Sequence, residues 1–189
     1  KEKGHNIFSV VVCSSQYGKN ENEGMKESEA LEYGLKSFEL IGADYIPTNK
    51  EPNSKLAYNK KIMQILEGIA NNKKIDAVFT HWYGDLNTDH KATWEISRTA
   101  FRNVKNFLMY QSNSYGDNVN IFKPNLFFSF NQEQYVFKEK ILSQYVSEWA
   151  RREIRWKREI FERERYWGHI SGNDYAEGFQ VGKVVDFFV

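Results

Sequence analysis

IDAVFTHWYGDLNTDHKATWEISRTAFR, residues 75–102, is the stretch from which the rest of the sequence is interpreted. It opens with a short apolar run, Ile75–Phe79, which follows two lysines and is typical of a buried parallel strand. After a polar loop, Ala92, Ile96 and Ala100 recur at every fourth position and predict a helix with one buried stripe. The stretch therefore predicts a strand, a loop and a helix, with the strand at the centre of a sheet.

The loop between this strand and this helix gathers polar side chains that can bind a metal ion. They are His81, Asp85, Asn87, Asp89 and His90. In open α/β sheets, ligands bind beyond the carboxyl ends of the strands, which is where the loop is expected to lie. The loop is therefore the candidate functional site. The alternative is a solvated loop whose polar residues only cap the helix.

His90 is the strongest candidate metal ligand in this loop. With Thr88 or Asp89 as the helix cap, His90 falls in the first helical turn, where the helix dipole disfavours an imidazolium and leaves a lone pair to donate. Asp89 could coordinate the same ion or orient a ligand through a hydrogen bond. His81, directly after the strand, either faces the site or closes the strand with a satisfied ring.

The segment THWYGDLNTDHKATWEISRTAFR, residues 80–102, resembles the second signature of the LmbE-like, or PIG-L-type, zinc-dependent N-deacetylases. In that pattern a strand ends in Thr-His, and Gly-Asp-Leu-Asn-x-Asp-His leads through a basic residue into a helix. The resemblance implies that His90 binds zinc (Zn2+) and that Asp89 supports the catalytic site without binding the ion. It also implies substrate contacts at the pocket mouth from His81, Trp82 and Asn87.

Further segments resemble the family in the same order along the chain. Lys26-Glu-Ser-Glu-Ala opens the helix predicted at Met25–Leu40 and resembles a family stretch that often begins with a substrate-facing arginine. Lys26 is thus a candidate substrate contact, although lysine lacks the planar two-pronged donor of arginine, and a solvated charge at the helix end is the alternative. With the matches at residues 122–126 and 166–179, the resemblance covers about residues 5–188.

The family's first strand ends in a His-Pro-Asp-Asp motif, which carries two zinc ligands and the general base. This motif does not occur in the sequence. The opening KEKGHNIFSVVVCSS is typical of the last turn of a helix, a stop at Gly4 and a buried strand at Ile7–Cys13. Because a βαβ unit spans about 30 residues, we expect the chain to start in the middle of its first unit.

These elements predict one LmbE-like deacetylase domain over residues 1–189 that is N-terminally incomplete. The expected fold is a three-layer, Rossmann-like α/β sandwich with a mostly parallel sheet that lacks its first strand. Further strands are expected at Ala43–Ile46, Asn106–Gln111, Leu126–Phe130 and, at a sheet edge, Val181–Val189. Helices are expected at Tyr58–Ala70 and over Gln132–Arg165.

Composition narrows the classes of partner. The formal net charge of +1 gives no electrostatic reason to expect nucleic acid or an anionic membrane. A single cysteine, Cys13, excludes an internal disulfide. No apolar run approaches the roughly 18 residues of a membrane span and no signal peptide is visible, so we expect a cytoplasmic protein without membrane insertion. The aromatic residues of Gln132–Arg165 could join two copies of the chain; an ion-paired, solvated face is the alternative.

The resemblance implies a zinc-dependent hydrolase that removes an N-acetyl group from an amino sugar or sugar conjugate, in polysaccharide or glycoconjugate metabolism. The general base is then expected in the absent His-Pro-Asp-Asp motif. The alternative function is a Rossmann-like module that binds a sugar or a nucleotide without chemistry. Against dinucleotide binding stands the lack of a G-x-G-x-x-G segment after a strand.

Overall fold

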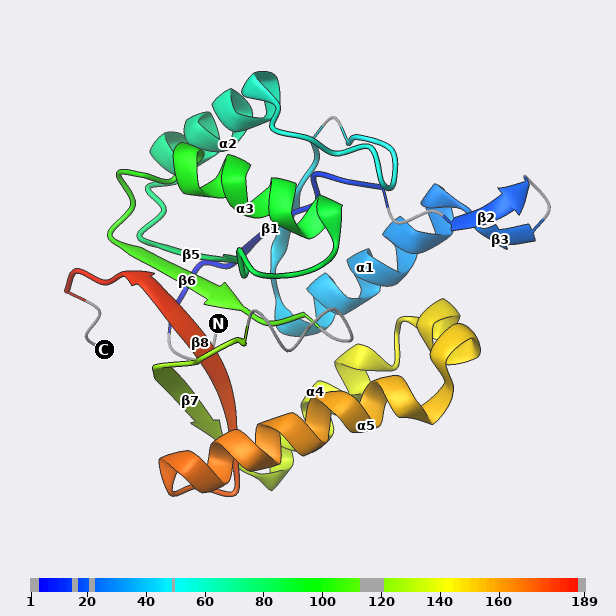
Figure 1. Cartoon of the computed structure of the whole chain (residues 1–189), viewed down its shortest axis with the longest axis vertical. Helices are drawn as coiled ribbons and strands as arrows, with labels where there is room; N and C mark the ends of the chain where they lie inside the picture. Colours follow the sequence, from blue (N-terminus) through cyan, green and yellow to red (C-terminus); the bar gives the residue numbers. More distant parts are fainter. Residues whose placement is uncertain (1–3, 15–16, 21–22, 49, 113–120, 187–189) are drawn as a thin grey trace.

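The computed structural model describes residues 4–14, 17–20, 23–48, 50–112 and 121–186, which form a mixed α/β fold (Figure 1). The strands are β1 (Phe8–Val10), β2 (Tyr17–Asn20), β3 (Glu23–Met25), β4 (Asp44–Ile46), β5 (Ala77–His81), β6 (Asn106–Tyr110), β7 (Leu126–Phe130) and β8 (Tyr175–Lys183). The helices are α1 (Glu27–Ile41), α2 (Lys60–Asn72), α3 (Thr88–Ala100), α4 (Gln132–Leu142) and α5 (Val146–Ser171).

The strands pair in both directions, so the parallel character of the fold is partial. β1 pairs with β4, and β5 with β6, in parallel. β8 lies between β6 and β7 and is antiparallel to both, and β2 and β3 form an antiparallel hairpin. The reversal of β8 follows from its connection: α4 starts beside the end of β7 and α5 returns to it, so Phe130 is paired with Tyr175. The predicted helical region Gln132–Arg165 is thus two helices.

Two strand positions differ from those predicted. β5 is at the edge of the four-stranded sheet β5-β6-β8-β7 in the described part of the chain, so the central position expected for Ile75–Phe79 is wrong. The final strand starts at Tyr175 and is internal, whereas Val181–Val189 was expected at a sheet edge. Gly178 allows other side chains to pack closely on this internal strand, because a Cβ at that position would lie within 3 Å of Pro124 and Trp167. Residues 187–189 lie outside the described residues.

The two parallel pairs share a core although they do not pair with each other. Val12, just after β1, and Val78 of β5 belong to the same cluster of buried apolar side chains. Among the strands that the structure describes, β1 pairs only with β4, and β5 only with β6. Side-chain packing therefore holds the two sheets together, and each of these strands keeps one edge without a described partner.

Helices α2 and α3 lie together over β5 and β6 (Figure 1). The predicted stripe of α3 is confirmed, because Ala92, Ile96 and Ala100 are all buried. α3 begins at a different cap from the one predicted. The Asn87 side chain, not that of Thr88 or Asp89, accepts hydrogen bonds from the first backbone N–H groups of the helix.

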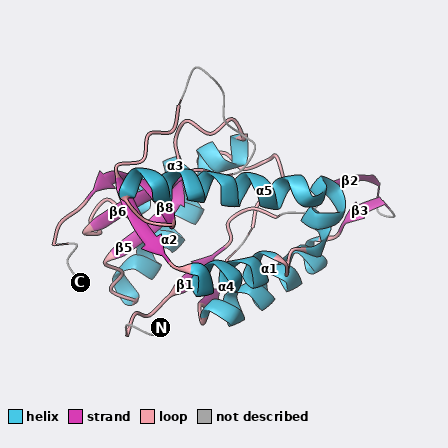
Figure 2. Cartoon of the chain, turned by 90° about the horizontal axis from the view of Figure 1, so that it is seen from below, coloured by secondary structure: helices cyan, strands magenta, loops and turns pink. Residues whose placement is uncertain are grey.

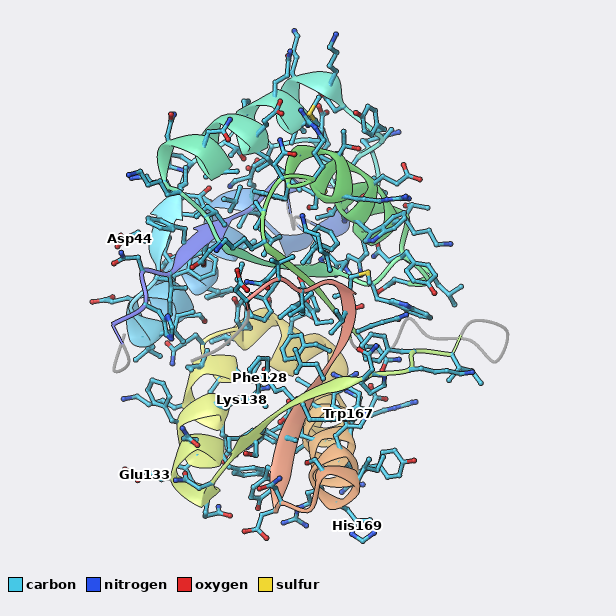
Figure 3. The ribbon with its side chains drawn as sticks, turned by 90° about the vertical axis from the view of Figure 1, so that its left-hand side faces the viewer. Asp44, Phe128, Glu133, Lys138, Trp167 and His169 are labelled. Carbon is cyan, nitrogen blue, oxygen red and sulfur yellow. The ribbon has the colours of Figure 1, made fainter. Side chains whose placement is uncertain are left out.

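A buried charge cluster ties α4 and α5 to β8. Lys138 of α4 forms ion pairs with both Glu164 of α5 and Glu177 of β8. Burial alone would lower the pKa of Lys138, but the two carboxylates outweigh it and raise the pKa. Figure 3 shows Lys138 and Trp167 on the two helices that flank β7 and β8.

The helices also contact one another and enclose part of their aromatic side chains. Figure 2 shows α1 beside α4, where the Ser37 hydroxyl donates to the carbonyl oxygen of Ile141 (3.2 Å). Phe161 and Trp167 of α5 are buried within the chain. The side chains of Trp149 and Trp156 lie outside the described residues, so a contact between two copies through this helix stays a prediction. In the part of the chain that the structure describes, no helix has the length and apolarity to span a bilayer.

Leu108→Ala tests the core beneath β6. Leu108 is fully buried (0% exposed), so its truncation should lower the free energy of unfolding by about 2–5 kcal/mol through lost burial and a residual cavity. Leu35→Ala is the matched control, because Leu35 on α1 is 40% exposed and its truncation should cost less than about 1 kcal/mol. Urea denaturation of both variants measures the difference. Equal losses would contradict the burial described for β6.

Candidate metal centre

The end of β5 and the start of α3 bring three potential metal ligands together. His81 ends β5, Asp85 lies in the loop, and His90 lies in the first turn of α3. One potential ligand atom from each lies within 4.8 Å of the others. The loop between them is tight: a Cβ on Gly84 would lie 2.3 Å from the ring of Trp82, so this position needs a glycine.

The imidazole of His90 is held through its Nδ1 atom. Nδ1 lies 2.9 Å from Asp85 Oδ2 and 3.1 Å from the hydroxyl oxygen of Ser112. Ser112 donates its own hydroxyl hydrogen to the same Asp85 oxygen, and the Asn87 backbone N–H donates to Asp85 Oδ1 (2.8 Å). Burial alone would raise the pKa of Asp85, but the hydrogen bonds from His90, Ser112 and Asn87 outweigh it and hold the pKa below its usual range. Asp85 is therefore an ionised, almost fully buried acceptor.

His81 faces the site and packs on His90. The two imidazole rings are stacked, with centroids 3.8 Å apart and planes 8° from parallel. The Nε2 atom of His81 lies 3.3 Å from the hydroxyl of Tyr110 on β6. Burial, and after it neighbouring His90, lowers the pKa of His81 to about 3 against the opposing effect of the Asp85 charge. His81 is therefore neutral in the folded protein.

The chemistry of this cluster fits one direct contact to a metal ion. With Nδ1 turned to Asp85, His90 offers its Nε2 lone pair, and a carboxylate on the opposite nitrogen is the common support of a metal-bound histidine. The stacked ring of His81 does not complete a chelate in this arrangement. Imidazole lone pairs lie in the ring plane, so those of two parallel rings run side by side and do not converge on one tetrahedral ion.

Asp89 lies beside His90 in sequence but faces another part of the fold. Its carboxylate accepts hydrogen bonds from the backbone N–H groups of Ser54 (2.7 Å) and Leu56 (3.2 Å). Consecutive helical residues are about 100° apart around the axis, so Asp89 and His90 do not share a face. The structure thus places Asp85, not Asp89, against the imidazole. Asp89 therefore connects the segment before α2 to the start of α3. Burial, and after it the charge of Asp89, raises the pKa of the Cys13 thiol to about 12.

The other predicted substrate contacts lie apart from this cluster. Trp82 is 2% exposed, and its ring packs edge-on against Phe122 at 5.5 Å, so it lies in the core and not at a pocket mouth. The Asn87 carboxamide oxygen caps α3 through the backbone N–H groups of Asp89 and His90. Lys26 is exposed at the start of α1. Substrate contacts by these residues stay predictions.

Sequence reasoning gave no role to Ser112 or Tyr110, which complete the cluster. Both come from the carboxyl end of β6, where Tyr110 is paired with His81 across the parallel strands. The signal was available, because polar residues that follow neighbouring parallel strands gather at one edge of a sheet. Asp85 was recognised as a metal-capable side chain, but its contact with His90 depends on the path of the loop.

Neither a protein-family model nor a curated protein matches the chain. Solved structures do match it. The N,N'-diacetylchitobiose deacetylase of Pyrococcus horikoshii is similar over 95% of this chain and 74% of its own, with a TM-score of 0.79 and 15% identity. The chain shares the fold of that enzyme. It also resembles GalB, the 4-carboxy-2-hydroxymuconate hydratase of Pseudomonas putida, over 100% of this chain and 89% of the other (TM-score 0.78, 15% identity).

A zinc-inhibited form of the teicoplanin deacetylase Orf2 is similar over 95% of this chain and 88% of its own, with a TM-score of 0.66 and 15% identity. At these identities the likenesses establish the fold. The proteins that share it include two deacetylases and a hydratase. The chemistry of this chain must therefore be argued from its own residues.

His81→Gln tests the neutral, buried imidazole. Because the folded-state pKa of about 3 lies below the unfolded value of about 6.5, the unfolded chain binds the proton first, and stability falls as pH drops below 6.5. In wild type, this group should lower the free energy of unfolding by up to about 1.4 kcal/mol for each unit by which the pH falls. Urea denaturation between pH 7 and pH 4 should show a shallower slope for the variant. Equal slopes would contradict the burial of His81.

Proposed function

We propose that the protein is a zinc-dependent hydrolase that removes an N-acetyl group from an amino sugar or sugar conjugate. The observation that carries this proposal is the orientation of His90, whose Nδ1 faces Asp85, so that Nε2 is the nitrogen that would bind a metal ion. His90 also stands at the histidine of the Asn-x-Asp-His motif. The fold supports the same chemistry, since two proteins that share it are named deacetylases.

Zinc bound at His90 supplies a Lewis acid that polarises the amide carbonyl and brings the pKa of water to about 7. The chain's own residues prepare the site for it. Asp85 and Ser112 hold the imidazole through Nδ1, and the ring of His81 covers one face of His90. Tyr110, whose pKa is raised by burial, stays protonated at neutral pH beside His81. These groups orient the ligand and exclude water from one side of the imidazole.

A catalytic zinc takes three protein ligands, so His90 needs partners. We propose that they and the general base come from a strand that precedes residue 1 and lies between β1 and β5. This is supported by β1 and β5 each having one edge that faces no partner strand among the described residues, although both strands border the same core. It is also supported by Gly4, whose positive φ of 80° is the conformation that ends a helix.

We propose an N-acetylated sugar as the substrate because the motif that contains His90 resembles deacetylases linked to polysaccharide and glycoconjugate metabolism. The chitobiose deacetylase with the same fold is consistent with a sugar at this position. The hydratase shows that the fold also carries other reactions. Release of acetate from a sugar is therefore the observation that separates the proposal from hydration and from binding without chemistry.

His90→Ala in the full-length protein tests the proposal. Loss of the direct ligand should remove bound zinc and reduce acetate release from N,N'-diacetylchitobiose and related sugars. The reduction should exceed the roughly 10- to 100-fold that is typical when a residue that only hydrogen-bonds to a metal ligand is replaced. Zinc content is measured by atomic absorption. His169→Ala is the control, because His169 is exposed near the end of α5 (Figure 3) and should change neither quantity. Wild-type protein that binds zinc but releases no acetate from any N-acetylated sugar would contradict the deacetylase function.

Zinc titration of residues 1–189 alone tests the proposed additional strand. Calorimetry should show that residues 1–189 bind zinc more than about 100-fold more weakly than the full-length protein. The reason is that direct metal ligands are then missing, and not only a residue that supports a ligand. Tight one-to-one binding by residues 1–189 would mean that His81, Asp85 and His90 rearrange into a sufficient site, and the strand proposal would then be wrong.

A further inference from the structure

We propose that Asp85 is a positioning residue that fixes the proton of His90 on Nδ1, and that Ser112 holds Asp85 in place for this purpose. The inference rests on the proposed function, because it concerns which nitrogen of His90 carries the lone pair that would bind the metal ion. It gives Asp85 the supporting role that the motif alone suggested for Asp89.

The direction of the hydrogen bond follows from the chemistry of the two groups. An ionised carboxylate can only accept, so the imidazole nitrogen 2.9 Å away must donate to it. Neutral histidine carries one ring proton, and a proton on Nδ1 leaves the lone pair on Nε2. The Asp85 contact therefore selects one of the two neutral tautomers of His90.

Asp85 cannot easily turn away from His90. One of its oxygens accepts the backbone N–H of Asn87 (2.8 Å), and the other accepts the Ser112 hydroxyl as well as the imidazole. Only 2% of the residue is exposed, so water does not compete for these lone pairs. Loss of any of these donors would leave a buried charge partly unsatisfied, which is costly.

Ser112 is itself held from a distant part of the chain. Arg163 of α5 reaches the carbonyl oxygen of Ser112 through its Nη1 atom (3.4 Å), while its guanidinium lies over the ring of Trp167. The hydroxyl of Ser112 lies within hydrogen-bond distance of both Asp85 and His90. β6 therefore supplies the group that locks the carboxylate, and α5 steadies the end of β6.

The chain offers a matched comparison in Asp89. Both aspartates are buried and lie near His90 in sequence, but the Asp89 carboxylate binds backbone N–H groups of Ser54 and Leu56. Replacing each by asparagine makes the same chemical change at two places. Only the change at Asp85 alters the group that faces the imidazole.

The experiment is nitrogen NMR of the histidine rings in metal-free protein at pH 7.5, with wild type, Asp85→Asn and Asp89→Asn. Wild type and Asp89→Asn should carry the His90 proton on Nδ1. In Asp85→Asn the Asn87 N–H still needs an oxygen, so the new NH₂ faces His90 and the proton should move to Nε2. Zinc affinity of full-length Asp85→Asn should then fall by about 10- to 100-fold.

Ser112→Ala is the second variant, and it keeps the carboxylate. The fraction of His90 that carries its proton on Nδ1 should lie between those of wild type and Asp85→Asn there, because Asp85 remains an acceptor but is no longer held by the Ser112 hydroxyl. A proton on Nε2 in wild type would overturn the proposal, and this holds even if Asp85→Asn does not fold. An unchanged tautomer in folded Asp85→Asn would overturn it too, and a Ser112→Ala variant with the wild-type tautomer fraction would overturn the role of Ser112. If the tautomers behave as expected but full-length wild type releases no acetate, the proposed function fails and the positioning role stands.

Discussion

The hydrogen bond between Asp85 and His90 constrains more of the structure than any other single contact near the site. A carboxylate that is 2% exposed must have its lone pairs satisfied, and a loop, a helix start and a neighbouring strand each provide a donor. The loop must therefore turn tightly at Gly84, and the helix must begin at the Asn87 cap. β6 must end beside β5 so that Ser112 can reach the carboxylate. Geometry that serves this one buried charge also sets the position of His90, the candidate metal ligand.

Sequence patterns predicted the elements better than their arrangement. The buried stripe of α3 and the position of β7 follow from local periodicity, which reports the side that each residue turns to the core. The place of β8 does not. It depends on a two-helix connection that reverses the chain and on pairing with strands far away in sequence. The same limit explains why β5 was expected at the centre of the sheet.

For the candidate site, too, the sequence predicted the residues better than their contacts. Residue types and the motif identified His90 and His81, because imidazole side chains directly after a strand or at a helix start are uncommon and chemically specific. The supporting role was assigned to Asp89 because the resemblance implied it and because Asp89 precedes His90 in sequence. A helix turns its consecutive side chains to different faces, so the neighbour in sequence was not the neighbour in space. Trp82 shows a second effect that the motif did not indicate, since the alternating strand direction turns its side chain into the core.

The insertion of β8 between β6 and β7 also sets the order in which the chain can fold during its synthesis. Among the described strands β7 pairs only with β8, so its edge with Phe127 and Phe128 stays open until the ribosome has added Phe179. The roughly 50 residues in between take about 3–10 s at typical elongation rates. During that interval an aromatic strand is available to pair with other nascent chains.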